Sequence, residues 1–359
     1  MRPTSATVRL ADIAANYELA RSLAPGSQSV AVIKANAYGH GMVKVAKYLE
    51  NQVPVFGVAL VEEAVRLRDA GIKRPILIMQ GPAEASDLEE AVAGGFWLLL
   101  HRQQQLDWVQ TAKLKSPLCV WLKMDTGMHR LGLAPNDIDR VCAGLKSSPN
   151  VRQPPVLCTH LACADDLEDP MTLEQVRIIR ESAGRNGLDM SIANSAGILF
   201  WPDSLAQWNR PGYMLYGLCP TGSTDTRPHG LRPAMTMRSE IIAIRNIAAG
   251  EGVGYGHDWV AGRPSKIGAI AIGYGDGYPR HAPSGTPVLV NGQRVALTGR
   301  VSMDAISVDL TDLEKVEVGD PVELWGQNLS VNELASKAGT IGYEVLAGLT
   351  GRVPVLHME

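Results

Sequence analysis

The chain of 359 residues lacks the features that mark several large classes of protein. No apolar run is as long as a membrane-spanning helix, and the residues after Met1 lack the apolar core of a signal peptide, so we expect neither an anchor nor secretion. The formal net charge is only −3 and the basic residues are scattered. We therefore expect no nucleic-acid partner and no binding to an anionic membrane surface.

Cysteine is also scarce, and its spacing is uninformative. The five cysteines (Cys119, Cys142, Cys158, Cys163 and Cys219) include no CxxC pair and no partner histidines at zinc spacing. An odd number of unclustered cysteines predicts reduced thiols in a cytoplasmic protein, with no metal site.

The composition is that of a large globular protein. Hydrophobic residues make up 45% of the chain, which is enough for a sizeable core and predicts two domains. In the first two thirds, short apolar or β-branched segments alternate with segments of helical periodicity. The strand-like segments begin near Val30, Val55, Ile76, Trp97, Leu118, Val156, Ser191 and Gln207.

Eight such units predict an α/β fold, a (β/α)8 barrel of the TIM type spanning residues 11–230. The helical segments are residues 61–70, 86–92, 104–114 and 173–183, and glycines such as Gly71, Gly95 and Gly187 follow them. No GxGxxG turn follows the first strand, which disfavours an open dinucleotide-binding sheet.

Beyond residue 231 the pattern changes to closely spaced strands. We expect a mainly antiparallel β domain over residues 231–359, with a strand from residues 1–10 packed on it. Its predicted strands are residues 235–247, 266–274, 287–290, 295–297, 305–310 and 321–324, with one short helix at 331–338.

The most informative single residue is Lys34, at the end of the apolar segment 29–33. A buried ammonium without a partner is costly, and a lowered pKa is the usual escape. A neutral amine in a pocket can attack an aldehyde such as pyridoxal phosphate. The alternative is an ordinary lysine that marks the strand end and extends to water.

Other polar residues cluster where the predicted strands end, which is the catalytic face of such barrels. They are Lys34 with Tyr38, residues 123–130, His160, Asn194 with Ser195, and Arg210 with Gly212 and Tyr213. Small residues after strands seven and eight would admit a phosphate group. Taken singly, His160 could be a core histidine and Arg210 a surface charge; five clusters at one end of the barrel favour a site.

The motifs in these clusters resemble those of the bacterial alanine racemase family over essentially the whole chain. The barrel motifs are VIKANAYGHG (residues 32–41), KMDTGMHRLG (123–132) and RPG (210–212). The second-domain motifs are VGYG (253–256), GYGDGY (273–278) and GRVSMD (299–304). The lysine motif recurs in related pyridoxal-phosphate barrels, whereas VGYG and RVSMD single out the racemases.

The resemblance implies a reaction with two bases. Lys34 would hold pyridoxal 5′-phosphate and serve one face of the substrate, that of D-alanine. Tyr255, supplied by the partner subunit of a homodimer, would serve the opposite face, that of L-alanine. Because a free tyrosine has a pKa near 10, the family pattern adds a hydrogen-bonded chain from Tyr255 through His160 to Arg210.

The resemblance also implies the remaining contacts. Arg210 would face the pyridine nitrogen of the cofactor and leave it largely unprotonated, since a guanidinium keeps its proton. The cofactor-binding residues would be Lys34, Tyr38, His160, Asn194, Ser195, Arg210, Gly212 and Tyr213. Arg130 and the backbone around Met303, which the partner subunit would supply like Tyr255, would bind the substrate carboxylate, and Tyr274 would narrow the entrance.

Two positions leave questions open. Lys123 is either carbamylated, so that its anion holds Arg130, or paired with Asp125 as an ordinary ion pair. Many family members carry a tyrosine before the terminal Arg-Val-Pro, where this chain has Gly351. One phosphate contact of the family is therefore expected to be missing.

The expected function is thus a racemase that supplies D-alanine for peptidoglycan, acting on a small-molecule substrate. A barrel-type amino-acid decarboxylase is one alternative, but it would need a longer second domain with a catalytic cysteine, and Cys219 is the last cysteine here. A non-catalytic pyridoxal-phosphate homeostasis protein is another, but it would lack the second domain. Serine differs from alanine by one hydroxyl, which such a pocket rejects weakly.

Overall fold

A computed structural model describes residues 3–224 and 229–359 and divides the chain into two compact units. The barrel unit comprises Ala14–Ala37 and Met42–Leu215, and the sheet unit comprises Met1–Ile13, Tyr38–Gly41 and Tyr216–Glu359. The sequence had placed Tyr216 and the residues up to 230 with the barrel. Tyr216 joins the sheet unit, where its ring stacks on His40, with centroids 4.4 Å apart, and contacts Tyr38 at 4.9 Å, and residues 217–224, 229 and 230 belong to the same unit.

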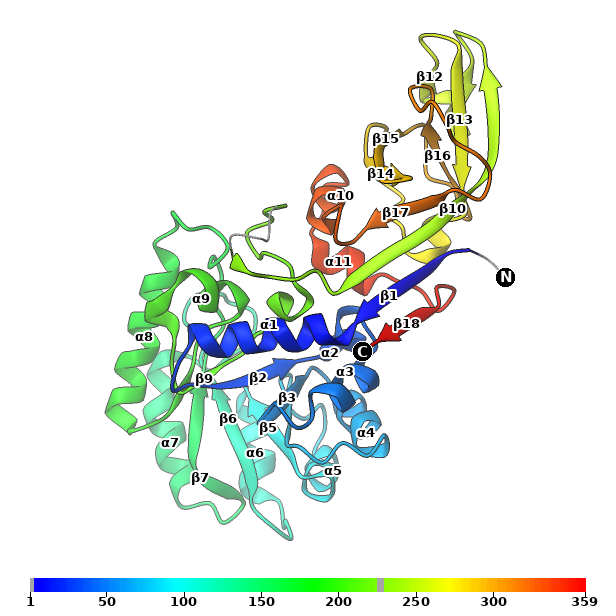
Figure 1. Ribbon diagram of the computed structural model, residues 1–359. Helices are drawn as coiled ribbons and strands as arrows, with labels where there is room; N and C mark the ends of the chain where they lie inside the picture. The colour runs from blue at the N-terminus through cyan, green and yellow to red at the C-terminus, as the bar shows by residue number, and fades with distance from the viewer. Residues whose placement is uncertain (1–2, 225–228) are drawn as a thin grey trace. The chain divides into compact units, whose positions relative to one another are not determined.

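The barrel unit contains a closed barrel of eight parallel strands, as predicted (Figure 1). The strands are β2 (Gln28–Val32), β3 (Val55–Val58), β4 (Ile76–Ile78), β5 (Phe96–Leu100), β6 (Leu118–Lys123), β7 (Val151–Cys158), β8 (Met190–Ser191) and β9 (Trp208–Asn209). β9 pairs with β2 and closes the ring. β3, β4 and β5 are apolar along their whole length, because both faces of a parallel sheet are covered.

Helices alternate with these strands in sequence. They are α1 (Leu10–Leu23), α3 (Met42–Leu49), α4 (Val61–Asp69), α5 (Asp87–Gly94), α6 (Gln103–Thr111), α7 (Ile138–Lys146), α8 (Met171–Asn186) and α9 (Ser195–Phe200). Gly95 and Gly187 end α5 and α8 in the left-handed conformation, which glycine adopts without a steric penalty. The glycines predicted to follow these helices therefore end them.

Large side chains fill the interior of the barrel. Val30, Val55, Leu77, Leu99, Trp121, Val156 and Cys158 form one buried cluster. Trp97 and Trp208 pack against it, each with its ring centroid within 6.4 Å of that of Trp121. The barrel is thus a packed core, and a small molecule can enter only at its ends.

The sheet unit is built on an eight-stranded, mainly antiparallel sheet, in the order β13-β16-β15-β14-β17-β10-β1-β18. Its strands are β1 (Ser5–Arg9), β10 (Met235–Ile247), β13 (Ser265–Ile270), β14 (Pro287–Val290), β15 (Gln293–Leu297), β16 (Ile306–Asp309), β17 (Pro321–Trp325) and β18 (Val355–Met358). The N-terminal strand β1 pairs antiparallel with β10 and parallel with β18. Residues 1 and 2 of the predicted N-terminal strand lie outside the described residues.

Smaller elements complete the sheet unit. A hairpin joins β11 (Gly252–Val253) to β12 (Trp259–Val260), and the described residues of the unit also form the helices α10 (Val331–Lys337) and α11 (Gly342–Ala347). The strand predicted over 266–274 ends at Ile270, because Gly273 begins a short 3-10 turn whose Asp276 side chain accepts from the Gly273 N–H at 2.9 Å. α11 and β18 were not predicted.

The segment after Lys34 has an uncommon backbone. Ala35, Asn36, Ala37 and Tyr38 all have φ between 51° and 56°, so α2 (Lys34–Tyr38) is a left-handed turn. Such a conformation costs an L-residue about 1–2 kcal/mol, and it persists only where the surrounding structure fixes it. No helix in the described parts of the chain is long and apolar enough to cross a membrane.

Candidate active site

Lys34 follows β2 at the carboxyl end of the barrel strands, as predicted. The Glu63 carboxylate holds the adjoining backbone: it accepts from the Ala35 N–H at 2.6 Å and from the Ala59 N–H at 2.7 Å. Burial lowers the pKa of Lys34, and Arg130 and Arg210 lower it further, while Glu63 opposes them. A larger fraction of this amine is therefore neutral, and available to attack a carbonyl or accept a proton, than in a surface lysine.

Arg130 lies in a loop that is closed at its base by backbone hydrogen bonds. The Asp125 N–H donates to Leu133 O at 2.9 Å, and the Leu133 N–H donates to Lys123 O at 2.8 Å. Asp125 Oδ1 accepts from the N–H groups of Gly127 and His129. A side chain at Gly132 would place its Cβ 2.5 Å from Asp125 N, so only glycine fits there. The loop is thus held in one shape before any ligand binds.

Lys123 ends β6 and is buried. Burial lowers the pKa of its amine, and the nearby Arg210 and Arg130 add to this effect. The predicted ion pair with Asp125 is absent: Asp125 Oδ2 contacts His129 Nδ1 at 3.1 Å, and among the described carboxylates none pairs with Lys123. A buried amine without a carboxylate remains.

His160 lies just after β7. Burial lowers the pKa of its imidazole well below the ordinary value, and the neighbouring cations Arg210, Lys123, Arg130 and Lys34 each add to the effect. The ring is therefore neutral at physiological pH. Four basic side chains around one neutral histidine form a region that favours an anionic ligand.

Arg210 is buried and firmly held. Its Nη1 donates to Ser191 Oγ at 2.6 Å, and its Nη2 donates to Thr159 O at 2.7 Å and Ile192 O at 3.2 Å. The hydrogen bond between Arg210 and the His160 ring that the family pattern implied is not formed here. Arg210 instead fixes the ends of β7 and β8 relative to each other.

The loops after β8 and β9 meet at Ser195. Its Oγ accepts from the Gly212 N–H at 3.0 Å and from the Met214 N–H at 3.2 Å. Asn194 caps α9 by accepting from the Gly197 N–H at 2.9 Å, and Tyr213 is buried beside Gly212. These four predicted residues therefore lie together at the position where barrels of this type bind phosphate.

Tyr255, Tyr274 and Met303 belong to the sheet unit, on adjoining segments. The Tyr274 N–H donates to Ser302 O at 3.0 Å, and a Cβ at Gly299 would lie 2.6 Å from Val253 O. All three side chains are exposed, Tyr255 to 67%, although each is largely apolar.

Two further predicted positions also belong to the sheet unit. Tyr38 is buried against Tyr216, and burial raises the pKa of its hydroxyl, which stays protonated. A Cβ at Gly351 would meet nothing within 4 Å, so this position has room for a side chain.

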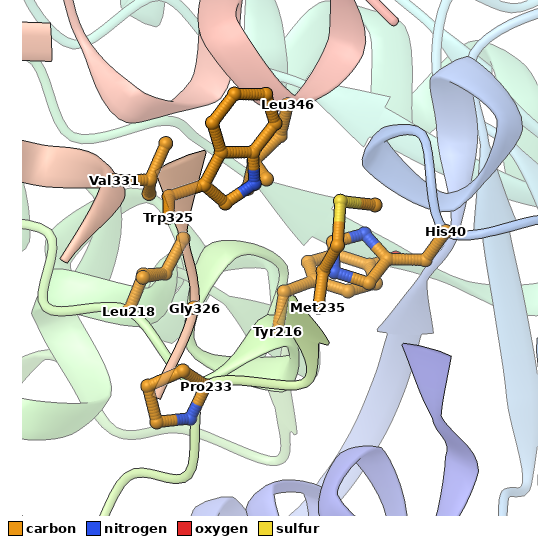
Figure 2. Close-up of a pocket in the computed structure, with 9 residues that line it drawn as sticks. All are labelled: His40, Tyr216, Leu218, Pro233, Met235, Trp325, Gly326, Val331 and Leu346. Atoms are coloured by element: carbon orange, nitrogen blue, oxygen red, sulfur yellow. The ribbon is translucent and has the colours of Figure 1, made fainter. Parts of the chain in front are cut away.

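A small cavity in the sheet unit is not a substrate site. The stacked rings of His40 and Tyr216 line it together with Met235 and Trp325 (Figure 2). Its volume of about 10 Å³ holds a single water at most. The Trp325 indole N–H, which has no acceptor among the described residues, is a donor that such a water would satisfy.

The sequence did not reveal Glu63 or Gln175, which hold the loops of this site. Glu63 is the third residue of α4 and its carboxylate accepts from backbone N–H groups near the helix start, so a glutamate at that helix position was the available signal. Gln175 is wholly buried in α8 and hydrogen-bonds to Thr126 and to the backbone of His160 and Ala162. Nothing in the sequence of α8 distinguishes this glutamine from a polar residue on the exposed face of a helix, so the sequence did not indicate its role.

The fold and the site together define an enzyme: a (β/α)8 barrel with a lysine-centred, positively charged site and an added β domain. The family model of the alanine racemase N-terminal domain matches residues 8–220, and that of the alanine racemase C-terminal domain matches residues 234–357. The chain belongs to the alanine racemase family.

Individual relatives cover almost all of the chain. It is 46% identical to the alanine racemase of Pseudomonas taetrolens, over 99% of this chain and 98% of that one. The crystal structure of biosynthetic alanine racemase from Pseudomonas aeruginosa superposes with a TM-score of 0.96, at 46% identity and full coverage of both chains. The alanine racemase from Bartonella henselae, with covalently bound pyridoxal phosphate, has a TM-score of 0.91 at 29% identity and the same coverage.

Proposed function

We propose that this protein interconverts L-alanine and D-alanine with pyridoxal 5′-phosphate and supplies D-alanine for peptidoglycan. The observation that carries the proposal is Lys34, whose pKa is lowered by burial at the catalytic end of the barrel, among cations suited to an anionic cofactor and substrate. The five free cysteines agree with a cytoplasmic protein.

The residues present fit this cofactor. Lys34 would hold its aldehyde carbon, and Ser195, Tyr38 and the backbone at Gly212 and Tyr213 would bind its phosphate beside Asn194. The bound cofactor withdraws electrons from the substrate and so makes the Cα proton removable. Arg210, anchored by Ser191 Oγ and Thr159 O, would keep a fixed positive charge beside the ring.

Two side chains would move the proton. Lys34 would serve the face of D-alanine, and Tyr255 from a second copy of the chain would serve the face of L-alanine, since inversion needs a base on each side. The neutral imidazole of His160 could accept a hydrogen bond from the Tyr255 hydroxyl and orient it, and the cations near His160, Arg210 and Lys123, would favour the phenolate form that a base needs. The exposure of Tyr255 in a single chain supports its use by a partner.

The substrate carboxylate would bind between Arg130 and the backbone near Met303 of the second copy, with Tyr274 at the entrance. No described carboxylate pairs with the buried amine of Lys123. Carbamylation would turn that amine into an anion, which would pair with Arg130. The open space at Gly351 leaves the entrance to Tyr274 with less help than in relatives that carry a tyrosine there.

Incubation of the purified protein with pyridoxal phosphate and L-alanine tests the proposal. Optical rotation should decay to zero as D-alanine forms, and a D-amino-acid oxidase should consume the product. Release of carbon dioxide with no D-alanine would instead identify a decarboxylase. If L-alanine were unchanged after saturation with cofactor, the proposed activity on alanine would be refuted.

A further inference from the structure

Gln175 is a wholly buried amide whose hydrogen-bonding groups all face the active-site loops. It lies in the second turn of α8. Its Nε2 donates to Thr126 Oγ1 at 2.9 Å and to His160 O at 3.0 Å, and its Oε1 accepts from the Ala162 N–H at 2.8 Å. Because unsatisfied buried amides are costly, these three bonds also fix which way the amide faces.

The direction of the hydrogen bonds beyond Gln175 follows from one carbonyl. Met124 O can only accept, so Thr159 Oγ1 donates to it at 3.0 Å. Thr126 Oγ1 must then donate to Thr159 Oγ1, at 2.7 Å, and must accept from Gln175. The hydrogen bonds therefore all run in one direction, from the Gln175 amide through the hydroxyls of Thr126 and Thr159 to the carbonyl at the end of β6. Each hydroxyl donates its single proton to the next acceptor.

This chain joins the loops that follow β6 and β7, and through Thr159 O it reaches Arg210. Thr126 belongs to the loop of Arg130, and a Cβ at Gly127 would lie 3.1 Å from Met171 Sδ, so that loop rests on the first turn of α8. Thr159 and His160 follow β7, and Thr159 O accepts from Arg210 Nη2.

We propose that Gln175 is a positioning residue, which holds His160 and the Arg130 loop at fixed positions for the reaction without touching substrate. The inference rests on the proposed function. A displacement of about 1 Å at a reacting group can cost roughly 10²-fold in rate, so a single amide that sets two groups at once has a large effect.

Gln175→Met removes all three hydrogen bonds and keeps a side chain of similar length. Gln105→Met is the matched control, because Gln105 is also a buried glutamine of a barrel helix, α6, with bonds of 2.9 Å to His101 N and Pro82 O. If the two glutamines were only structural, both changes would act alike.

The first readout is the rate of Cα-proton exchange divided by the rate of racemisation. Both rates are measured on the cofactor-loaded, full-length enzyme in deuterated water. With saturating D-alanine, Gln175→Met should slow racemisation roughly 10²-fold, whereas exchange of the D-alanine Cα proton by Lys34 should fall much less. The ratio of exchange to racemisation should therefore rise, and Gln105→Met should leave it unchanged.

The second readout is the titration of the His160 ring by NMR, assigned by its loss in His160→Asn. In the wild type the ring should stay neutral well below pH 6.5, and in Gln175→Met its titration should move toward the ordinary range. Equal effects of the two glutamine changes, or an unmoved titration and ratio in Gln175→Met, would overturn the proposal.

Two further variants keep the test decisive if Gln175→Met does not fold. Thr126→Val breaks the same chain and Thr126→Ser preserves its hydroxyl, so only the valine variant should alter the ratio and the titration; identical behaviour of the two would reject the idea. If the wild type forms no D-alanine, the proposed function fails, and the His160 titration alone decides whether Gln175 holds His160.

Discussion

At the scale of single residues, burial and charge act together on the amines of the barrel unit. Burial is the largest cause of the lowered pKa at both Lys34 and Lys123, and Arg130 and Arg210 add to it at each. Neither amine has an ion-pair partner among the described carboxylates. A neutral amine can attack a carbonyl carbon, which is the property that the covalent roles proposed above for Lys34 and Lys123 require.

Lys34→Ala should abolish racemisation and also the covalent retention of the cofactor. Borohydride reduction of the wild type should fix the cofactor to the peptide that contains Lys34, as peptide mass spectrometry would show. Lys44→Ala, which removes an exposed lysine of α3, should behave as the wild type. Labelling of any other lysine would refute the assignment.

The lowered pKa of His160 has a consequence for acid stability. The folded state keeps this imidazole neutral well below pH 6.5, whereas in the unfolded chain it takes up a proton near that value. The unfolded state therefore binds more protons below pH 6.5, and the free energy of unfolding falls as the pH decreases through that range. Urea titrations between pH 7 and 5 should show a shallower fall for His160→Asn, and equal slopes would mean that His160 is not held neutral.

At the scale of elements, the left-handed turn after Lys34 is the least usual feature. Ala35 has φ 51° and ψ 52° and is exposed, so a glycine there would keep the fold and relieve steric strain. Ala35→Gly should raise the free energy of unfolding by about 1 kcal/mol, measured by urea denaturation.

Ala93→Gly, at an exposed position of the right-handed helix α5, is the matched control. It should lower the free energy of unfolding by about 0.5–1 kcal/mol, the usual cost of glycine in a helix. Destabilisation of similar size in both variants would show that the turn is not left-handed in solution.

Repeating elements could be predicted from the sequence, and singular ones could not. The apolar segments near Val30, Val55 and Leu118 alternate with helical periodicity, and this pattern was enough to predict the closed barrel. The left-handed turn was not predictable, since Ala35 and Ala37 favour ordinary helices and only the packed surroundings hold them otherwise. β18 was missed because a strand added parallel to β1 depends on contacts distant in sequence.

Only those residues of the candidate site that directly follow a predicted strand could be predicted from the sequence. Lys34, His160 and Arg210 each follow a predicted strand, and the fold places them close enough to Lys123 and Arg130 for these cations to lower the pKa of His160. Gln175 could not be found in this way, because its function depends on a hydrogen-bond chain between loops that follow different strands.

At the scale of the whole molecule, the sheet unit exposes the side chains that the proposed function assigns to a second copy of the chain. Tyr255 is 67% exposed and Met303 52% exposed, on adjoining segments that also carry Tyr274. Clustered apolar side chains on a protein surface commonly mark an interaction site. The two-base proposal gives these side chains a use, as parts of the active site of a partner.

Subunit complementation tests this central claim most directly. Lys34→Ala alone should be nearly inactive, and Tyr255→Phe alone should be slowed by about 10²–10⁴, the usual contribution of one general base. When the two variants are unfolded and reassembled together, half of the dimers should be mixed, and each mixed dimer should have one site with both bases. Racemisation should then recover to roughly a quarter of the wild-type rate; no recovery, with mixed dimers confirmed by mass, would contradict a site shared between two copies.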